Sequence, residues 1–259
     1  MGVARWPPVT HLRHDVSLTA PPREWADAVL DAVVAEIEAA RFDDELRLAE
    51  PGLAAADVRI VQGPHLSPGA RYSAGTDGDE ITVHEWSPRT RIAFSVADER
   101  PMATASTAVE ILPGTRSRIA TLSGLLQVAG PFPKLRRVTW DGHVDLDRWW
   151  AGQPAAIEAT VEHRWARCRV TAQATTVGKR WTVRCEARGR GRSWGRLMAA
   201  VVLLIWRGAL VREFRKSLDE AARGWDETLA HWQGAAPHDA ARALLAALVT
   251  ALVEPVSTE

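Results

Sequence analysis

The sequence predicts an α+β fold in which a large antiparallel β-sheet is combined with a long C-terminal helix. Three observations lead to this prediction. Apolar side chains recur at helical spacing over residues 193–232, short strand-like runs separated by turns fill residues 58–128, and residues 12–37 combine strand spacing with helix spacing. We expect the sheet to be antiparallel, because the connections between its strands are too short for parallel crossovers.

The chain opens with a predicted strand that leads directly into a helix. Alternate side chains of the strand share one predicted buried face, namely Leu12, His14, Val16 and Leu18. Pro21 and Pro22 end the strand, and Glu24 suits the positive end of a helix dipole. The helix that follows has an apolar stripe made of Trp25, Val29, Val33 and Ile37.

The middle of the chain predicts a meander of strands. The strand-like runs are 58–61, 70–74, 81–86, 91–96, 103–112 and 116–128, followed after a gap by 157–176 and 180–188. Residues 129–156 are rich in Pro, Gly and Trp and predict an irregular insertion. A two-residue turn at Val177-Gly178 would place Cys168 and Cys185 diagonally across the last hairpin, which disfavours a disulfide.

The long helix organises the rest of the chain. Its first half, residues 197–206, is almost uniformly apolar, and its second half continues as a one-sided stripe to Trp232. We expect a break at Arg207-Gly208, because glycine weakens a helix.

Two parts of the chain are distinguished by this pattern. Residues 1–232 are interpreted as one domain, and residues 233–259 as a C-terminal tail. The tail contains an apolar helix at 239–253, which is expected to pack on the domain or to form a homodimer, because it cannot remain in water alone.

The composition argues against several classes of protein. The 259 residues include 32 basic and 32 acidic side chains, and this balance argues against a general nucleic-acid binder. The N-terminus lacks the apolar core of a signal peptide, and the longest apolar stretch is too short to span a membrane, so we expect a cytoplasmic protein. The two cysteines lack histidines at zinc-site spacing. Residues 141–147 lack the later glycine and the closing glutamate of a calcium loop and favour a turn with a helix cap, so no metal is expected.

Four segments carry motifs that belong together. They are a strand with Ala-Pro and Trp at 16–25, two strands around Ser-Pro at 81–94, a Pro-Gly-Thr-Arg hairpin at 109–116 and the end of the long helix at 214–225. Together these motifs resemble the SRPBCC superfamily, which includes START lipid-transfer domains, pollen-allergen-like proteins and polyketide cyclases. The resemblance implies a helix-grip fold, in which a curved antiparallel sheet of about nine strands wraps around a long C-terminal helix. The insertion at 129–156 departs from the pattern of the superfamily.

The same resemblance implies a cavity between the sheet and the long helix that binds a hydrophobic small molecule or lipid. The main hypothesis is a polyketide cyclase or aromatase-like enzyme that works by general acid–base chemistry without a cofactor. The alternative is a carrier or sensor that binds a lipid or isoprenoid and performs no chemistry. A third hypothesis is an interaction module that binds a partner through the tail helix.

Polar side chains on the inward faces of predicted strands are the candidate catalytic residues: His14, Tyr72, Glu85 and His163. His163 is preferred, because the alternation shifts near Trp165 and a β-bulge there would aim the imidazole at the long helix. The residues expected to line the cavity are Trp165, Phe94, Val202, Ile205 and Trp206.

Arginines are concentrated where the last strand meets the long helix. Arg188, Arg190 and Arg192 lie beside the predicted helix N-terminus, which is a natural binding site for anions. A lipid phosphate would fit there, and so would the phosphopantetheine and acidic surface of an acyl carrier protein. A solvated edge strand explains the same charges.

Overall fold

The computed structural model describes residues 9–49, 58–75, 79–100, 103–113, 118–131, 136–192, 195–232 and 234–253, with the backbone alone at residues 9, 99–100, 195–207 and 248–253. The strands are β1 (Val9–Thr19), β2 (Arg59–Gln62), β3 (Arg71–Ala74), β4 (Asp79–Ser87), β5 (Arg91–Arg100), β6 (Ala103–Pro113), β7 (Arg118–Val128), β8 (Arg137–Asp145), β9 (Ile157–His163), β10 (Ala166–Val177) and β11 (Arg180–Gly191). The helices are α1 (Arg23–Ala39), α2 (Leu146–Trp150), α3 (Gly195–Trp232) and α4 (Pro237–Val253).

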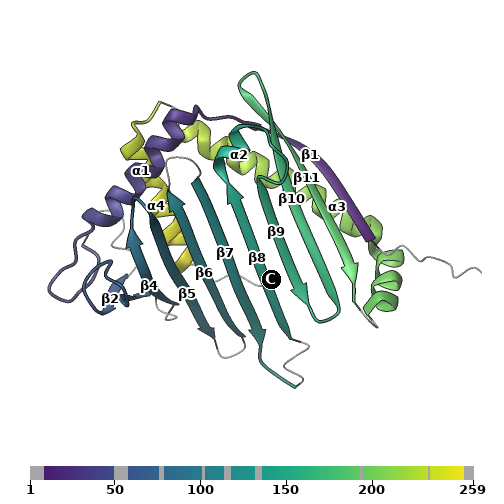
Figure 1. Ribbon diagram of the computed structural model, residues 1–259, viewed down its shortest axis with the longest axis horizontal. Coiled ribbons are helices and arrows are strands. Elements are labelled where there is room, and N and C mark those ends of the chain that lie inside the picture. The colour runs from purple at the N-terminus through teal and green to yellow at the C-terminus, as the bar shows by residue number, and fades with distance from the viewer. Residues whose placement is uncertain are drawn as a thin grey trace, which may run out of the picture.

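One large antiparallel sheet forms the body of the protein, as the sequence predicts (Figure 1). Its 11 strands follow the order β1-β11-β10-β9-β8-β7-β6-β5-β4-β3-β2. From β2 to β11 the sheet is a simple meander, and β1 then pairs with β11 along its whole length. The first and last strands of the chain therefore lie side by side.

The sheet has more strands than the sequence predicts, for two reasons. Part of the segment predicted to be irregular is strand β8, followed by helix α2, and the predicted strand 157–176 is divided into β9 and β10 by a turn at Arg164-Trp165. β8 contains glycine and aspartate, which are rare in strands, so the sequence pattern did not predict it as a strand. In the sheet, Trp140 of β8 lies over Gly124 of β7, where a side chain's Cβ would be 2.2 Å from the indole. The absence of a side chain at Gly124 makes room for the indole of Trp140.

Helix α3 runs unbroken from Gly195 to Trp232, so the predicted break at Arg207-Gly208 is wrong. One glycine costs a helix only about 1 kcal/mol, which is too little to end a long cooperative helix. The helix contacts β1, β10 and β11, where Phe214, Leu218 and Ala222 pack against buried side chains of the sheet.

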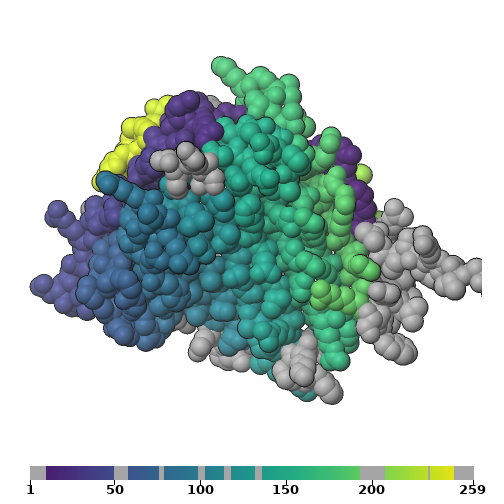
Figure 2. Space-filling model, viewed as in Figure 1, coloured from purple at the N-terminus to yellow at the C-terminus, as the bar shows by residue number. Residues whose placement is uncertain are grey.

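The tail helix α4 packs on the domain, which was the first of its two predicted alternatives. Val29 of α1 forms a buried cluster with Ala240 and Ala241 of α4. Helices α3 and α4 lie on the same face of the sheet, behind the strands in Figure 1, and the strands form the face that Figure 2 shows. Within the described ranges, no helix is long and apolar enough to cross a membrane.

The buried side chains form separate clusters along the sheet. The largest lies at the β1 end and contains Val16, Trp149, Ala156, Ala174, Trp181, Val183 and Cys185. Another lies on β3, β4 and the residue before β3, and contains Ala70, Tyr72 and Val83. The two ends of the sheet thus have different cores, with α1 and α4 packed together nearer the second.

Candidate functional site

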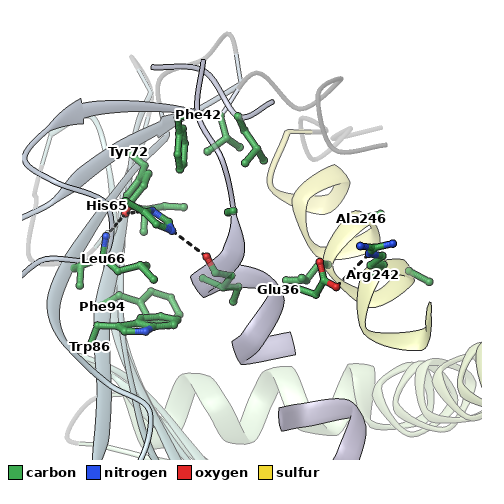
Figure 3. Close-up of a pocket in the computed structure, with 17 residues that line it drawn as sticks. Glu36, Phe42, His65, Leu66, Tyr72, Trp86, Phe94, Arg242 and Ala246 are labelled. Carbon is green, nitrogen blue, oxygen red and sulfur yellow. Dashed lines mark hydrogen bonds and ion pairs between the residues drawn. The ribbon is translucent and has the colours of Figure 1, made fainter. Parts of the chain in front are cut away.

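A cavity of about 690 Å³ lies at the β2 end of the sheet. Its walls come from β3, β4 and β5, from the C-terminal end of α1, from α4, and from Phe42, Leu48, Val58, His65 and Leu66 (Figure 3). The sequence predicted a cavity under the long helix, but no described side chain of α3 lines this one. Because α3 lies across β1, β10 and β11, the tail helix α4 forms the helical wall instead.

The lining of the cavity is mostly apolar. Aliphatic and aromatic side chains such as Ile81, Val83, Trp86 and Phe94 cover the sheet side, and Ala243, Leu245 and Ala246 of α4 face them. Of the 17 lining residues, those with polar side-chain groups that can ionise are Glu36, His65, Tyr72 and Arg242. Such a surface favours a hydrophobic ligand that is oriented by a few polar contacts.

His65 connects three parts of the cavity wall (Figure 3). Its Nε2 lies 2.9 Å from the carbonyl oxygen of Ile37 at the end of α1, and its Nδ1 lies 2.9 Å from the hydroxyl of Tyr72 on β3. A carbonyl oxygen only accepts hydrogen bonds, so in the neutral imidazole Nε2 carries the proton and Nδ1 accepts. The Tyr72 hydroxyl therefore donates to His65 and accepts from the N–H of Leu66, at 2.7 Å.

Tyr72 is held in this network with 7% of its surface exposed. Burial raises the pKa of Tyr72, because the phenolate would lose its hydration, and the hydrogen bond from the Leu66 N–H opposes this effect. The rings of Phe42, His65 and Tyr72 also contact one another, with centroids 5.0 to 6.1 Å apart. The phenol is thus a neutral, fixed part of the wall.

An ion-pair cluster joins α1 to α4 beside the cavity. Oε1 of Glu36 lies 3.1 Å from Nε of Arg242 and 2.8 Å from Nδ1 of His238. The Glu36 side chain is only 13% exposed, whereas those of Arg242 and His238 are more than half exposed. The cluster therefore fixes the position of α4 at the outer edge of the cavity.

Two of the residues proposed from the sequence, Tyr72 and Phe94, line this cavity. Glu85 does not line the cavity, so the expectation that it faces inward is wrong. A β-bulge between Val83 and Glu85 reverses the alternation, so Trp86 rather than Glu85 shares the inner face with Val83. Glu85 instead forms an ion pair with Arg91, at 3.1 Å.

His163, the preferred catalytic candidate, lies outside the cavity. It is the last residue of β9 and borders the turn to β10, so the bulge predicted near Trp165 is wrong and a hairpin turn explains the shift in alternation. Its ring contacts that of Trp165, which is 44% exposed. His14 does face inward, as predicted, but its Nε2 lies 2.7 Å from Oδ1 of Asp219 and ties β1 to α3.

The other sequence candidates do not form a site with these residues. The side chains of Val202, Ile205 and Trp206 are outside the described residues. Arg188 pairs with Glu186 at 3.0 Å, and Arg192 pairs with Glu162 at 3.1 Å. In the described part of the chain no carboxylate pairs with Arg190. β11, which carries Arg188 and Arg190, is an internal strand, so the predicted edge position of these two arginines is wrong.

Sequence reasoning missed His65. It lies in the loop Pro64-His65-Leu66-Ser67-Pro68-Gly69, whose composition is typical of an ordinary turn. The backbone of this loop is unusual at Leu66, which has a positive φ of 57°. That conformation is uncommon for a residue other than glycine and turns the Leu66 N–H toward Tyr72.

No protein-family model matches the chain. No curated protein matches it either. Among solved structures, the crystal structure of Ara h 8.0201 matches with 10% sequence identity, covering 81% of this chain and 99% of that chain, at a TM-score of 0.17. A TM-score this low does not establish a shared fold.

Proposed function

We propose that the protein binds a hydrophobic small molecule in the cavity between α1, α4 and strands β3 to β5. The observation that carries this proposal is a mainly apolar space of about 690 Å³ with a few polar groups in its wall. This size and polarity are typical of ligand pockets.

We also propose that the fold is a helix-grip fold of the SRPBCC type. The order of elements supports this, because a strand and a helix precede the meander, the last strand returns to pair with β1, and the long helix α3 follows and lies across that junction. The sheet is larger than the resemblance implies, and the cavity is closed by α4. A fold of this kind does not by itself assign chemistry.

Binding without catalysis has better support than the cyclase hypothesis. A general base must have a free atom within reach of the proton that it removes. Both ring nitrogens of His65 are engaged, one by the Ile37 carbonyl and the other by the Tyr72 hydroxyl. Glu36 faces the guanidinium group of Arg242 and the imidazole of His238. These polar groups of the cavity are thus already bound to other groups of the protein, which favours a carrier or sensor.

The experiment compares two neighbouring alanines of α4. Ala246 lines the cavity, whereas Ala247 is exposed. Ala246→Trp should fill the cavity and weaken binding of the neutral fluorescent probe N-phenyl-1-naphthylamine by roughly tenfold or more, while Ala247→Trp should bind as the unmodified protein does. Equal affinity of the two variants would contradict the proposal. Mass spectrometry of molecules that co-purify with the unmodified protein would identify the natural ligand.

A further inference from the structure

A second cavity lies at the N-terminal end of α1, whereas the first lies at its C-terminal end. It encloses about 640 Å³ between the β1–α1 connection, the turn from β10 to β11, helix α2 and the last turns of α3. The indoles of Trp25, Trp150 and Trp181 form much of its wall. None of its lining residues belongs to the cavity described above.

Trp181 is the centre of an aromatic cluster beside this cavity. The centroid of its ring lies 5.3 Å from that of Trp150 and 5.5 Å from that of Trp149, and both pairs are edge to face. The ring centroid of Trp225 is 6.3 Å away. Only 3% of its surface is exposed. The indoles are therefore held in fixed positions, and a flat ring could pack against them without reordering the wall.

Hydrogen-bond donors without acceptors belong to the same wall. The indole N–H of Trp25 donates to the carbonyl of Ala235, and that of Trp225 donates to the carbonyl of Thr19. Within the described residues, the indole N–H groups of Trp150 and Trp181 have no such acceptor. Neither nitrogen is among the buried side-chain atoms that lack a partner in the described residues, so each N–H can be reached from the cavity, and an acceptor on a bound molecule can take the place of water there.

The charged side chains that line the cavity are both basic. Lys179 lines it from the tip of the β10–β11 turn, and no carboxylate in the described part of the chain pairs with its ammonium group. Arg23 also lines it, but is already paired with Asp147 and Asp27. No lining residue is acidic. An anionic group would therefore meet Lys179 without opposition from within the wall.

We propose that this cavity is a second ligand site and that it takes an aromatic carboxylate. The aromatic ring packs against the indoles of Trp25, Trp150 and Trp181. The carboxylate accepts hydrogen bonds from the free indole N–H groups and pairs with Lys179. The site is independent of the proposed function, because the two cavities share no lining residue.

Isothermal titration calorimetry with 2-naphthoate tests the proposal. Lys179→Glu should weaken binding roughly tenfold or more, since it replaces a charge-assisted contact by repulsion. The control is Lys216→Glu, which makes the same change of charge on the exposed face of α3. Trp150→Phe keeps an aromatic wall but removes a donor, and should weaken 2-naphthoate more than it weakens the neutral analogue 2-naphthylmethanol.

The same experiment separates this site from the first cavity. Ala246→Trp, which fills the first cavity, should leave 2-naphthoate binding unchanged. Loss of 2-naphthoate binding in Ala246→Trp, equal affinity in Lys179→Glu and Lys216→Glu, or no binding by the unmodified protein would each overturn the proposal. Failure of N-phenyl-1-naphthylamine to bind would contradict only the proposed function.

Discussion

Tyr72 shows most directly how one side chain depends on its surroundings in this protein. Its hydroxyl accepts a hydrogen bond from Leu66 and donates one to His65, and its ring is buried. These contacts suit a neutral phenol. Burial accordingly raises the pKa of Tyr72 above its ordinary value of 10.0.

Titration of Tyr72 can be followed without interference, because it is the only tyrosine in the chain. We expect the phenolate absorption of the folded protein to develop at a higher pH than that of the protein in concentrated urea, where the pKa returns to about 10. A folded-state pKa at or below the urea value would contradict the buried network.

The same pKa shift makes stability depend on pH. Below pH 10 the phenol is neutral in both the folded and unfolded states, so its stabilising contribution is fully present. Above that pH the unfolded state ionises first, and the contribution is lost as the pH rises toward the raised folded pKa. The free energy of unfolding of Tyr72→Phe should therefore fall less steeply above pH 10 than that of the unmodified protein.

At neutral pH, Tyr72→Phe should lower the free energy of unfolding by roughly 1–3 kcal/mol, because the N–H of Leu66 and Nδ1 of His65 lose their partner. Urea unfolding at pH 7 measures this change. Thr90→Val serves as a control, since it removes an exposed hydroxyl that bonds only to Ser87. A loss no greater than in the control would show that the network does not stabilise the fold.

The two cysteines illustrate how register acts on single residues. Cys168 is opposite Gly189 and Cys185 is opposite Ala172, so the two thiols do not meet. Both are free, and burial raises the pKa of each. Since the thiolate is the reactive form, both should react with Ellman's reagent more slowly in the folded protein than in urea at the same pH. Fast reaction of both thiols in the folded protein would contradict their burial.

At the scale of elements, α4 determines whether the first cavity, which Tyr72 lines, is closed. It is anchored to α1 through Ala240 and Ala241, which are almost completely buried, and through the Glu36 ion pairs. The turn of α4 that follows this anchor, at residues 243–246, lines the cavity. Closure therefore depends on the packing of one helix on another and not on the sheet.

Ala241→Asp should release α4, because it would bury a carboxylate at a position that is 0% exposed. N-phenyl-1-naphthylamine binding should be lost, while the far-ultraviolet circular dichroism of the sheet is retained. Ala247→Asp, at an exposed position of the same helix, is the control and should bind the probe normally. Retained binding in Ala241→Asp would show that α4 is not needed for the cavity.

For the whole molecule, the decisive contact is the pairing of β1 with β11. It runs from Val9 opposite Arg190 to Thr19 opposite Arg180, and it joins the first strand of the chain to the last strand of the meander. β1 also brings Val16 into the largest buried cluster. Without it, β11 would be left as a long unpaired edge.

A chain that begins at Ala20 should therefore aggregate or unfold without a cooperative transition. A synthetic peptide of residues 9–19 should restore soluble, cooperatively unfolding protein when added in excess, and a peptide of the same composition in scrambled order should not. Size-exclusion chromatography and urea unfolding measure both effects. Normal behaviour of the shortened chain without peptide would show that β1 is dispensable.

Much of this architecture is determined by local features of the sequence. Alternating side chains define β1, and helical spacing defines α1 and α3, because these periods follow from backbone geometry alone. The short connections made the sheet antiparallel. The turn before β11 was predicted one residue too early, at Val177-Gly178, whereas the structure places Gly178 and Lys179 between the strands with Gly178 at a φ of 63°. Glycine's freedom to adopt positive φ located the turn, but not its register.

The candidate site was decided by tertiary structure. A bulge between Val83 and Glu85 turned Glu85 outward, and a hairpin turn placed His163 away from the cavity that Tyr72 and Phe94 line. His65 became part of a wall only because Ile37 and Tyr72, which belong to separate predicted elements, lie on either side of its ring. Strand alternation indicates which side of a sheet a residue faces, but a single inserted residue reverses it, and no periodicity shows which loop closes over which helix.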